Sequence, residues 1–240
     1  MMSRKLIVSV LTALGLAFNS SALAEATHVV QKNETLSEIA EKFGVGMDQL
    51  MRRNHLQNAA KIHAGQRLAI PRNRAALSSD LSQRLEHVRI ERGKWKYIVI
   101  HHSGSESGSA RAFDRYHREE RHMENGLAYH FVIGNGNGMA DGEIAIGNRW
   151  KEQLDGGHLA SESLNEKSIG ICLVGNFDEE RPSERQMRAL DALINYLLDH
   201  CHLKTSAIKT HQKINPIYTR CPGRHFPTQD FLKEIKQERS

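Results

Sequence analysis

The stretch that decides the fold is YIVIHHSGS, residues 97–105. Its first four residues are uncharged and β-branched or aromatic, which is typical of a buried strand. The strand then ends in His101 and His102, followed by serines and glycines. The carboxyl end of a buried strand is a common place for a site in α/β proteins. On these nine residues alone a turn with two solvated imidazoles is the simpler interpretation, so the rest of the chain has to decide.

Beyond Lys96 the sequence alternates between strand and helix patterns, which predicts an α/β domain with a mixed central sheet flanked by helices. SIGICLVGNF, residues 168–177, is long and apolar enough to be a strand buried on both faces. In the helix predicted over 181–201, Ser183 and Gln186 fit a capping box. Further helices are predicted over 109–121 and 226–235, and further strands over 127–134 and near 143–147.

The loop KTHQKINPIYTRCPGRHFP, residues 209–227, contains His211 and Cys221. Together with His101 they make two imidazoles and one thiol. Zinc favours nitrogen and sulfur donors, and three protein ligands leave its fourth position for water. The chain has 14 histidines, so accidental triples of this kind are common and the triple alone is weak evidence.

Four segments in order strengthen it: IVIHHSG, LAYHFVIG, GGHLASESLNEKSIGICLVGNF and THQKINPIYTRCPGRHFP. Over residues 96–236 they resemble the zinc amidase family that includes phage lysozyme-type N-acetylmuramoyl-L-alanine amidases and peptidoglycan recognition proteins. The resemblance implies hydrolysis of the amide between N-acetylmuramic acid and L-alanine in peptidoglycan. It also implies Zn²⁺ held by His101, His211 and Cys221, with Tyr129 and Thr219 in catalytic roles.

The chain departs from this family in two places. The gap between His211 and Cys221 is longer than usual, which predicts a bulge at residues 214–217. Thr219 stands where phage members carry lysine, as in the recognition-protein branch, and a hydroxyl donates a hydrogen bond but supplies no charge. His158, in GGHLA, is expected to contact substrate, the alternative being a solvated loop histidine. His102 points the other way along the strand and is expected to serve packing or to support a ligand residue.

Residues 27–71 form a smaller unit with the order strand, helix, helix, strand, a βααβ pattern. Its segments NETLSEIAEKFG, LMRRNHL and IHAGQRLAIP resemble the LysM module. That resemblance implies binding to N-acetylglucosamine-containing glycans between two loops, with Thr35, Leu36 and Ile62 as contact residues. For Thr35 and Leu36 a purely structural role in capping the first helix is an equal alternative.

Residues 1–24 have a basic start, an apolar run and the small-residue triplet Ala22-Leu23-Ala24, which is typical of a secretory signal peptide. We therefore expect an exported protein, periplasmic rather than fully secreted, with no membrane span. The formal charge of +5 falls to +3 without Arg4 and Lys5, too little to indicate nucleic-acid binding. Residues 72–95 are expected to be a linker with one short exposed helix around 81–88.

Two other functions stay open on the sequence. One is a peptidoglycan-binding protein without activity, although the relatives of that kind lack the thiolate ligand and Cys221 is present here. The other is a zinc peptidase that cuts the stem peptide. The three cysteines do not suggest a disulfide framework, and Cys172 is expected to be a small buried apolar residue. The expected partner is peptidoglycan, and a monomer is the expected state.

Overall fold

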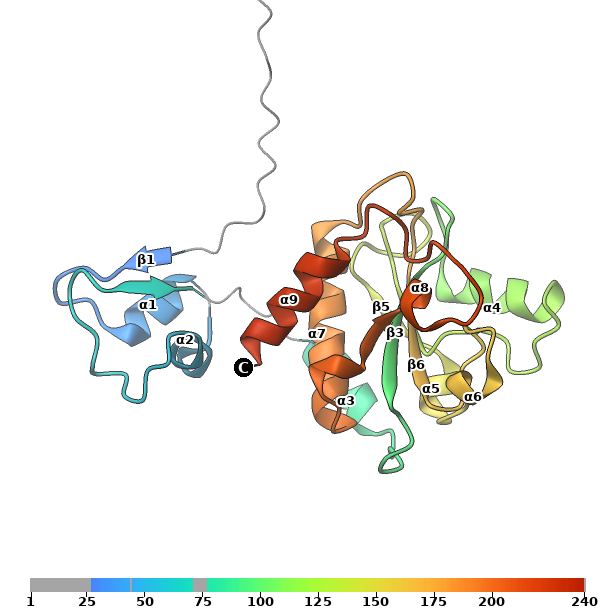
Figure 1. The fold of residues 1–240 in the computed structure, drawn as a ribbon, viewed down its shortest axis with the longest axis horizontal. Helices are drawn as coiled ribbons and strands as arrows, with labels where there is room; N and C mark the ends of the chain where they lie inside the picture. Colours follow the sequence, from blue (N-terminus) through green and yellow to red (C-terminus); the bar gives the residue numbers. More distant parts are fainter. Residues whose placement is uncertain (1–26, 44, 71–76, 240) are drawn as a thin grey trace, which may run out of the picture.

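The computed structural model describes residues 27–43, 45–70 and 77–239, which form two units (Figure 1). In the N-terminal unit, β1 (Thr27–Val29) pairs antiparallel with β2 (Arg67–Ala69), and α1 (Leu36–Phe43) and α2 (Met47–Arg53) lie between them in sequence. The predicted strand, helix, helix, strand order is confirmed. The apolar faces of both helices and the two strands enclose a core that includes Leu36, Ile39, Leu50 and Leu68.

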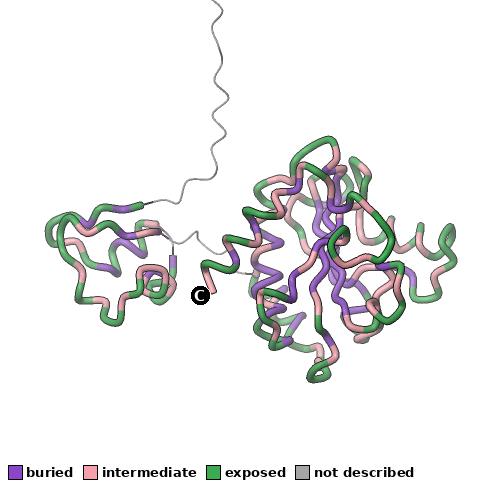
Figure 2. The backbone as a smooth tube through the Cα atoms, in the orientation of Figure 1, coloured by how far each residue is buried: buried purple, intermediate pink, exposed green. Residues whose placement is uncertain are grey.

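The second unit is built on a mixed sheet, as predicted. Among the described residues this sheet has five strands in the order β5-β4-β6-β3-β7. Only the β4–β5 pair is antiparallel. The bounds are β3 (Tyr97–His102), β4 (Phe131–Ile133), β5 (Ile144–Ile146), β6 (Ser168–Leu173) and β7 (Ile208–Thr210). All six residues of the central strand β6 are buried, which confirms that both of its faces are covered (Figure 2).

Helices cover the sheet on both faces. The larger core joins Ile98 and Ile100 of β3 to α7 (Glu184–His200) and α9 (Thr228–Glu238). A smaller core contains Val132 and Cys172 and is flanked by Phe113 of α4 (Ala110–Glu119). Because side chains alternate along a strand, His101 points away from Ile100, toward the face that carries this smaller core. The single-turn helices are α5 (Asn148–Lys151), α6 (Glu162–Asn165) and α8 (His211–Ile214).

The prediction of an exposed helix in the linker is wrong as to its exposure. Residues 79–86 do form a helix, α3 (Ser79–Glu86), but its Leu81 and Leu85 are buried in the larger core together with Trp95. Apolar residues recur every four positions along this segment, which gives an otherwise charged helix one apolar stripe. The described part of the predicted linker, 77–95, therefore packs against the second unit.

The predicted signal peptide, residues 1–24, lies outside the described residues. Within the part of the chain that the structure describes, no helix combines the length and apolar character needed to cross a membrane.

Candidate metal centre and active site

The topology of the sheet brings two distant histidines together. β3 and β7 are parallel neighbours, with Ile100 paired to Thr210. The carboxyl ends of both strands therefore lie together, where His101 is the second-last residue of β3 and His211 follows directly after β7. The chain returns to this edge through residues 215–221, and the amide of Gln212 donates to the carbonyl of Cys221 at 2.8 Å. That hydrogen bond holds the returning loop beside α8.

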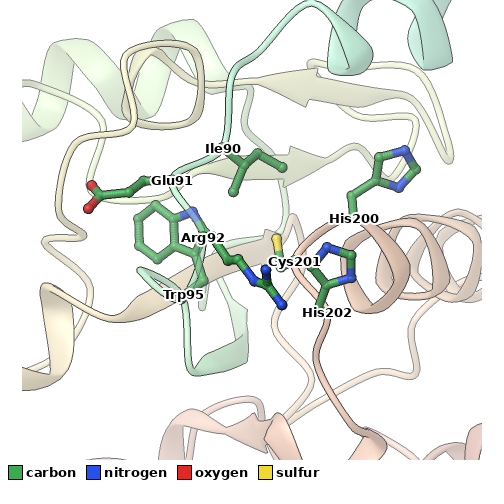
Figure 3. A pocket seen from close by; sticks show the side chains of 8 residues that line it. Ile90, Glu91, Arg92, Trp95, His200, Cys201 and His202 are labelled. Atoms are coloured by element: carbon green, nitrogen blue, oxygen red, sulfur yellow. The ribbon is translucent and has the colours of Figure 1, made fainter.

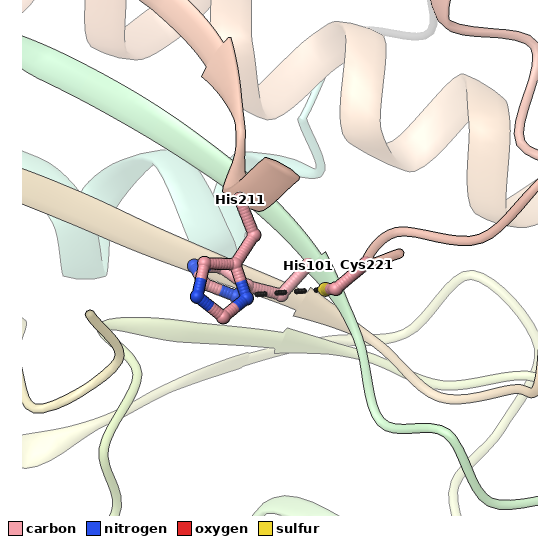
Figure 4. Close-up of side chains that lie close together, drawn as sticks. All are labelled: His101, His211 and Cys221. Carbon is pink, nitrogen blue, oxygen red and sulfur yellow. Dashed lines mark hydrogen bonds between the residues drawn. The ribbon is translucent and has the colours of Figure 1, made fainter. Parts of the chain in front are cut away.

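The three predicted ligands form one cluster. Ligand atoms of His101, His211 and Cys221 all lie within 4.8 Å of one another, and His101 Nδ1 is 3.8 Å from Cys221 Sγ (Figure 4). Donors at zinc–nitrogen and zinc–sulfur distances from a single tetrahedral ion lie roughly 3.3–3.6 Å apart. The observed donors are slightly wider, so small side-chain rotations gather them. The donor set and its spacing fit zinc.

Burial prepares these groups for a cation. Burial holds the pKa of His101 well below its usual value of 6.5, and it lowers the pKa of His211 as well, so both rings are neutral and have a lone pair to offer. In the metal-free protein burial raises the pKa of the Cys221 thiol to about 12, opposed by the hydrogen bond from the His102 amide at 3.4 Å. A bound cation replaces the thiol proton, since metal-coordinating cysteine is a thiolate.

His158 lies directly beside His101, away from the solvent. Its Nδ1 is 2.9 Å from Nε2 of His101, and its own Nε2 is 3.3 Å from the carbonyl oxygen of Ser168. The residue is only 7% exposed. Both ring nitrogens are therefore engaged, and neither is available for the substrate contact predicted from the sequence. The alternative of a solvated loop histidine is wrong for the same reason.

Tyr129 precedes β4 and is half-buried at the site. Its ring centroid lies 5.3 Å from that of His101 and 5.8 Å from that of His117 on α4. Burial first, and then the nearby thiols of Cys172 and Cys221, raise the pKa of the hydroxyl well above 10. Tyr129 therefore keeps its proton at neutral pH and acts as a hydrogen-bond donor.

Thr219 lies on the loop that delivers Cys221. Its Oγ1 accepts a hydrogen bond from the Cys221 amide at 3.1 Å, which orients the hydroxyl next to the ligand. The same loop is fastened by Asn215, whose Oδ1 accepts from the amide of Ala160 at 2.9 Å and whose Nδ2 donates to the carbonyl of Ile217 at 2.7 Å. Sequence reasoning missed Asn215, since a single asparagine beside proline signals only a turn.

His102 has the packing role expected for it. Its Nδ1 accepts a hydrogen bond from the amide of Phe177 at 3.0 Å, and the two rings are in contact at 5.8 Å between centroids. Its backbone meets the ligand cluster, since its amide donates to Cys221 Sγ at 3.4 Å and its carbonyl oxygen lies 4.0 Å from the same sulfur.

In the N-terminal unit the predicted contact residues differ in what they offer. Thr35 is exposed and caps α1, because its Oγ1 accepts from the Glu38 amide at 3.2 Å while its own amide donates to the Glu38 carboxylate at 2.8 Å. Ile62 is partly buried against the core. Leu36 is 1% exposed, so its side chain is a core residue and the predicted sugar contact through it is corrected.

A separate hollow of about 230 Å³ lies near the carboxyl end of α7 (Figure 3). Ile90, Arg92, Trp95 and Cys201 are among the residues that line it, and no predicted site residue does. Burial raises the pKa of the Cys201 thiol to about 12. Cys201 is therefore an unreactive thiol at neutral pH, and it is not a member of the ligand cluster.

Comparison with known proteins finds a matching family for each of the two units. A family model described as N-acetylmuramoyl-L-alanine amidase (Amidase_2) matches residues 91–224, and a LysM domain model matches residues 28–71. Peptidoglycan recognition protein 1 of Mus musculus is 31% identical over 164 residues, which cover 64% of this chain and 81% of that protein. An N-acetylmuramoyl-L-alanine amidase of Sus scrofa is 27% identical over 49% of this chain, but only 18% of that protein is covered.

Among solved structures, N-acetylmuramoyl-L-alanine amidase LysC from Clostridium intestinale URNW is similar with a TM-score of 0.51 and 30% sequence identity. The match covers 59% of this chain and 85% of LysC. The Amidase_2 model alone covers more than half of the chain. The chain therefore belongs to the N-acetylmuramoyl-L-alanine amidase family, Amidase_2, and carries a LysM domain before the amidase domain.

Proposed function

We propose that this protein hydrolyses the amide bond between N-acetylmuramic acid and L-alanine in peptidoglycan, with Zn²⁺ held by His101, His211 and Cys221. The observation that carries the proposal is the convergence of these three side chains within 4.8 Å at the sheet edge. Membership of the amidase family supports the reaction class. Cys221 supports an active enzyme over a pure binding protein, because a thiol completes the donor set for a catalytic zinc site.

When bound, zinc supplies a Lewis acid and lowers the pKa of a coordinated water toward about 7. The protein's own contribution is to place hydrogen-bond donors where negative charge develops on the amide oxygen. Tyr129 has a protonated hydroxyl and lies against His101. Thr219 offers its hydroxyl proton, since its oxygen already accepts from the Cys221 amide. Donors in a partly buried site stabilise such charge far more than water does.

The LysM domain acts in this proposal as a tether. Binding to the glycan strand keeps the amidase domain close to its polymer and raises the effective concentration of scissile bonds without taking part in the chemistry. Thr35 and Ile62 remain the proposed contacts on the loops of that domain. The proposed partner is peptidoglycan, and the signal-like residues 1–24 support an exported, periplasmic protein.

The test is incubation of the zinc-loaded protein with purified muropeptides, followed by mass spectrometry of the products. We expect free stem peptides that begin with L-alanine and a matching lactyl-bearing sugar. Cuts inside the stem indicate a zinc peptidase, and binding without cleavage indicates a recognition protein. Either of those outcomes contradicts the proposed reaction.

A further inference from the structure

We propose that His158 is a positioning residue that fixes the tautomer of His101, so that the lone pair of His101 lies on Nδ1 and faces the metal. The inference rests on the zinc site of the proposed function but concerns a step before catalysis, the assembly of that site. It assigns His158 a role in metal binding in place of substrate contact.

The tautomer follows from a chain of two hydrogen bonds. The carbonyl oxygen of Ser168 only accepts, so the His158 Nε2 that lies 3.3 Å from it carries the proton. In a neutral ring His158 Nδ1 then has the lone pair. His101 Nε2, 2.9 Å from that lone pair, must be the donor. The remaining nitrogen, His101 Nδ1, is therefore unprotonated.

The free nitrogen faces the correct direction. His101 Nδ1 is the atom that lies 3.8 Å from Cys221 Sγ, on the side of the ligand cluster (Figure 4). His101 is 1% exposed and His158 is 7% exposed, so water does not compete for either end of the chain of bonds. An opposite tautomer puts a proton between His101 and the metal and leaves two lone pairs facing each other.

The surrounding chain is shaped to hold His158 in this pose. A Cβ atom on Gly170 of β6 would lie 2.4 Å from the His158 ring, and one on Gly156 would lie 2.6 Å from it. Both positions must stay without side chains for the ring to fit. The backbone of His158 is fixed as well, because Asn165 Oδ1 accepts from the amides of His158 and Leu159 at 3.1 and 3.0 Å. A glycine inside a central strand normally weakens that strand, so Gly170 needs a reason to be in β6. The space that it leaves for the His158 ring is that reason.

Two substitutions of His158 separate positioning from filling space. His158→Phe keeps a planar ring but has no acceptor for His101. His158→Gln restores one acceptor and one donor and is the rescuing variant. His87→Phe is the matched control, since His87 is an exposed histidine at the end of α3. Zinc affinity is measured by competition with a chelator, and the His101 tautomer by ¹⁵N imidazole NMR of the metal-free protein.

We expect His158→Phe to weaken zinc binding about 10- to 100-fold, the range found for lost partners of metal-ligating histidines. His158→Gln should recover most of that loss, and His87→Phe should bind zinc as the wild type does. In the wild type, NMR should show His101 protonated on Nε2, and in His158→Phe a mixture of tautomers. Unchanged zinc affinity in a folded His158→Phe, or a wild-type His101 protonated on Nδ1, overturns the inference.

The wild-type NMR measurement decides the matter even if His158→Phe does not fold. These readouts are also independent of cleavage. A wild type with the expected tautomer and tight zinc binding that cuts no muropeptide leaves the inference standing and contradicts the proposed function alone.

Discussion

The two sides of the candidate metal site are built in different ways. His101 lies near the carboxyl end of the buried strand β3 and is 1% exposed, with its Nε2 2.9 Å from Nδ1 of His158. His211 and Cys221 are joined by a loop whose Ile217 and Tyr218 are 64% and 82% exposed. His101 and His211 are therefore placed by the neighbouring strands β3 and β7, whereas Cys221 belongs to an arm fastened by a few hydrogen bonds. The sheet therefore places two of the three proposed ligands, and the loop adds the third.

The largest effect is expected from removing the ligand on the loop side. Cys221→Ala should abolish zinc retention and lower amidase activity at least about 1,000-fold, because two imidazoles alone make a weak zinc site. Cys201→Ala removes a buried thiol elsewhere and is the matched control. Metal content after dialysis and product formation are the measurements. A zinc-loaded, active Cys221→Ala protein would show that the ligand set is wrong.

The next largest effect is expected from removing the hydroxyls of Tyr129 and Thr219, the proposed hydrogen-bond donors to the amide oxygen of the substrate. Tyr129→Phe should lower kcat about 100- to 1,000-fold with zinc content unchanged, the scale of a lost oxyanion donor. Thr219→Val should lower kcat by less, about 10-fold, the scale of one ordinary hydrogen bond, because an aliphatic hydroxyl is a weaker donor than a phenol. Thr219→Ser keeps the hydroxyl and should stay near the wild type. Steady-state kinetics on a soluble muropeptide checks all three, and an unaltered kcat in Tyr129→Phe contradicts its assigned role.

The buried histidines His130 and His158 should also make the metal-free protein less stable in acid. Burial lowers the pKa of His158 to about 3 and holds that of His130 well below 6.5. Below pH 6.5 the unfolded chain binds protons that the folded protein refuses, so stability is lost as the pH falls from 6.5 toward these folded values. Each such histidine contributes about 1.4 kcal/mol per pH unit within that window.

Urea unfolding in the presence of a chelator, between pH 7 and 5, measures this slope. His130→Gln should reduce it by the contribution of one proton, since His130 is bonded through both nitrogens to Gly170 and Leu154 but lies outside the ligand set. A free energy of unfolding of the amidase domain that does not change over this range contradicts the neutral, buried state of these rings.

The smallest effect is expected on the loop arm. Asn215→Ala removes the hydrogen bonds to Ala160 and Ile217, so the arm that carries Cys221 should become less ordered. Zinc affinity should fall by about 2- to 10-fold, the equivalent of roughly one ordinary hydrogen bond. Asn137→Ala, in an exposed turn near Glu106, is the control and should bind zinc normally. A loss as large as that of Cys221→Ala would mean that the loop is not a separable arm.

The elements that were easiest to predict from the sequence are those in which a regular apolar pattern extends over many residues. The strand over β6, the capped helix α7 and the βααβ unit were all predictable, because burial on both faces, a capping box and helical spacing are local signals. β7 was missed because its three residues are too short for a pattern, yet β7 is what brings His211 to His101. The packing of α3 was missed because two leucines were outweighed by its charges.

The candidate site was predictable in its donor types but not in its support. The three donor residues, His101, His211 and Cys221, were identified from the resemblance to a family. The proximity of the two histidines results from the parallel pairing of β3 and β7. The bond from His101 to His158 spans 57 positions, and nothing local in GGHLA distinguishes a buried partner from a solvated loop residue. Likewise the resemblance to LysM placed Leu36 in the sugar-binding loop, although it is also the first apolar position of α1, which faces the core.

The most direct test of the account is X-ray absorption at the zinc edge of the purified wild-type protein. We predict one zinc per chain with one sulfur at about 2.3 Å and two imidazole nitrogens at about 2.0 Å. Loss of the sulfur scatterer in Cys221→Ala should accompany loss of the metal. A protein that retains no zinc, or a bound zinc without a sulfur ligand, contradicts the central claim.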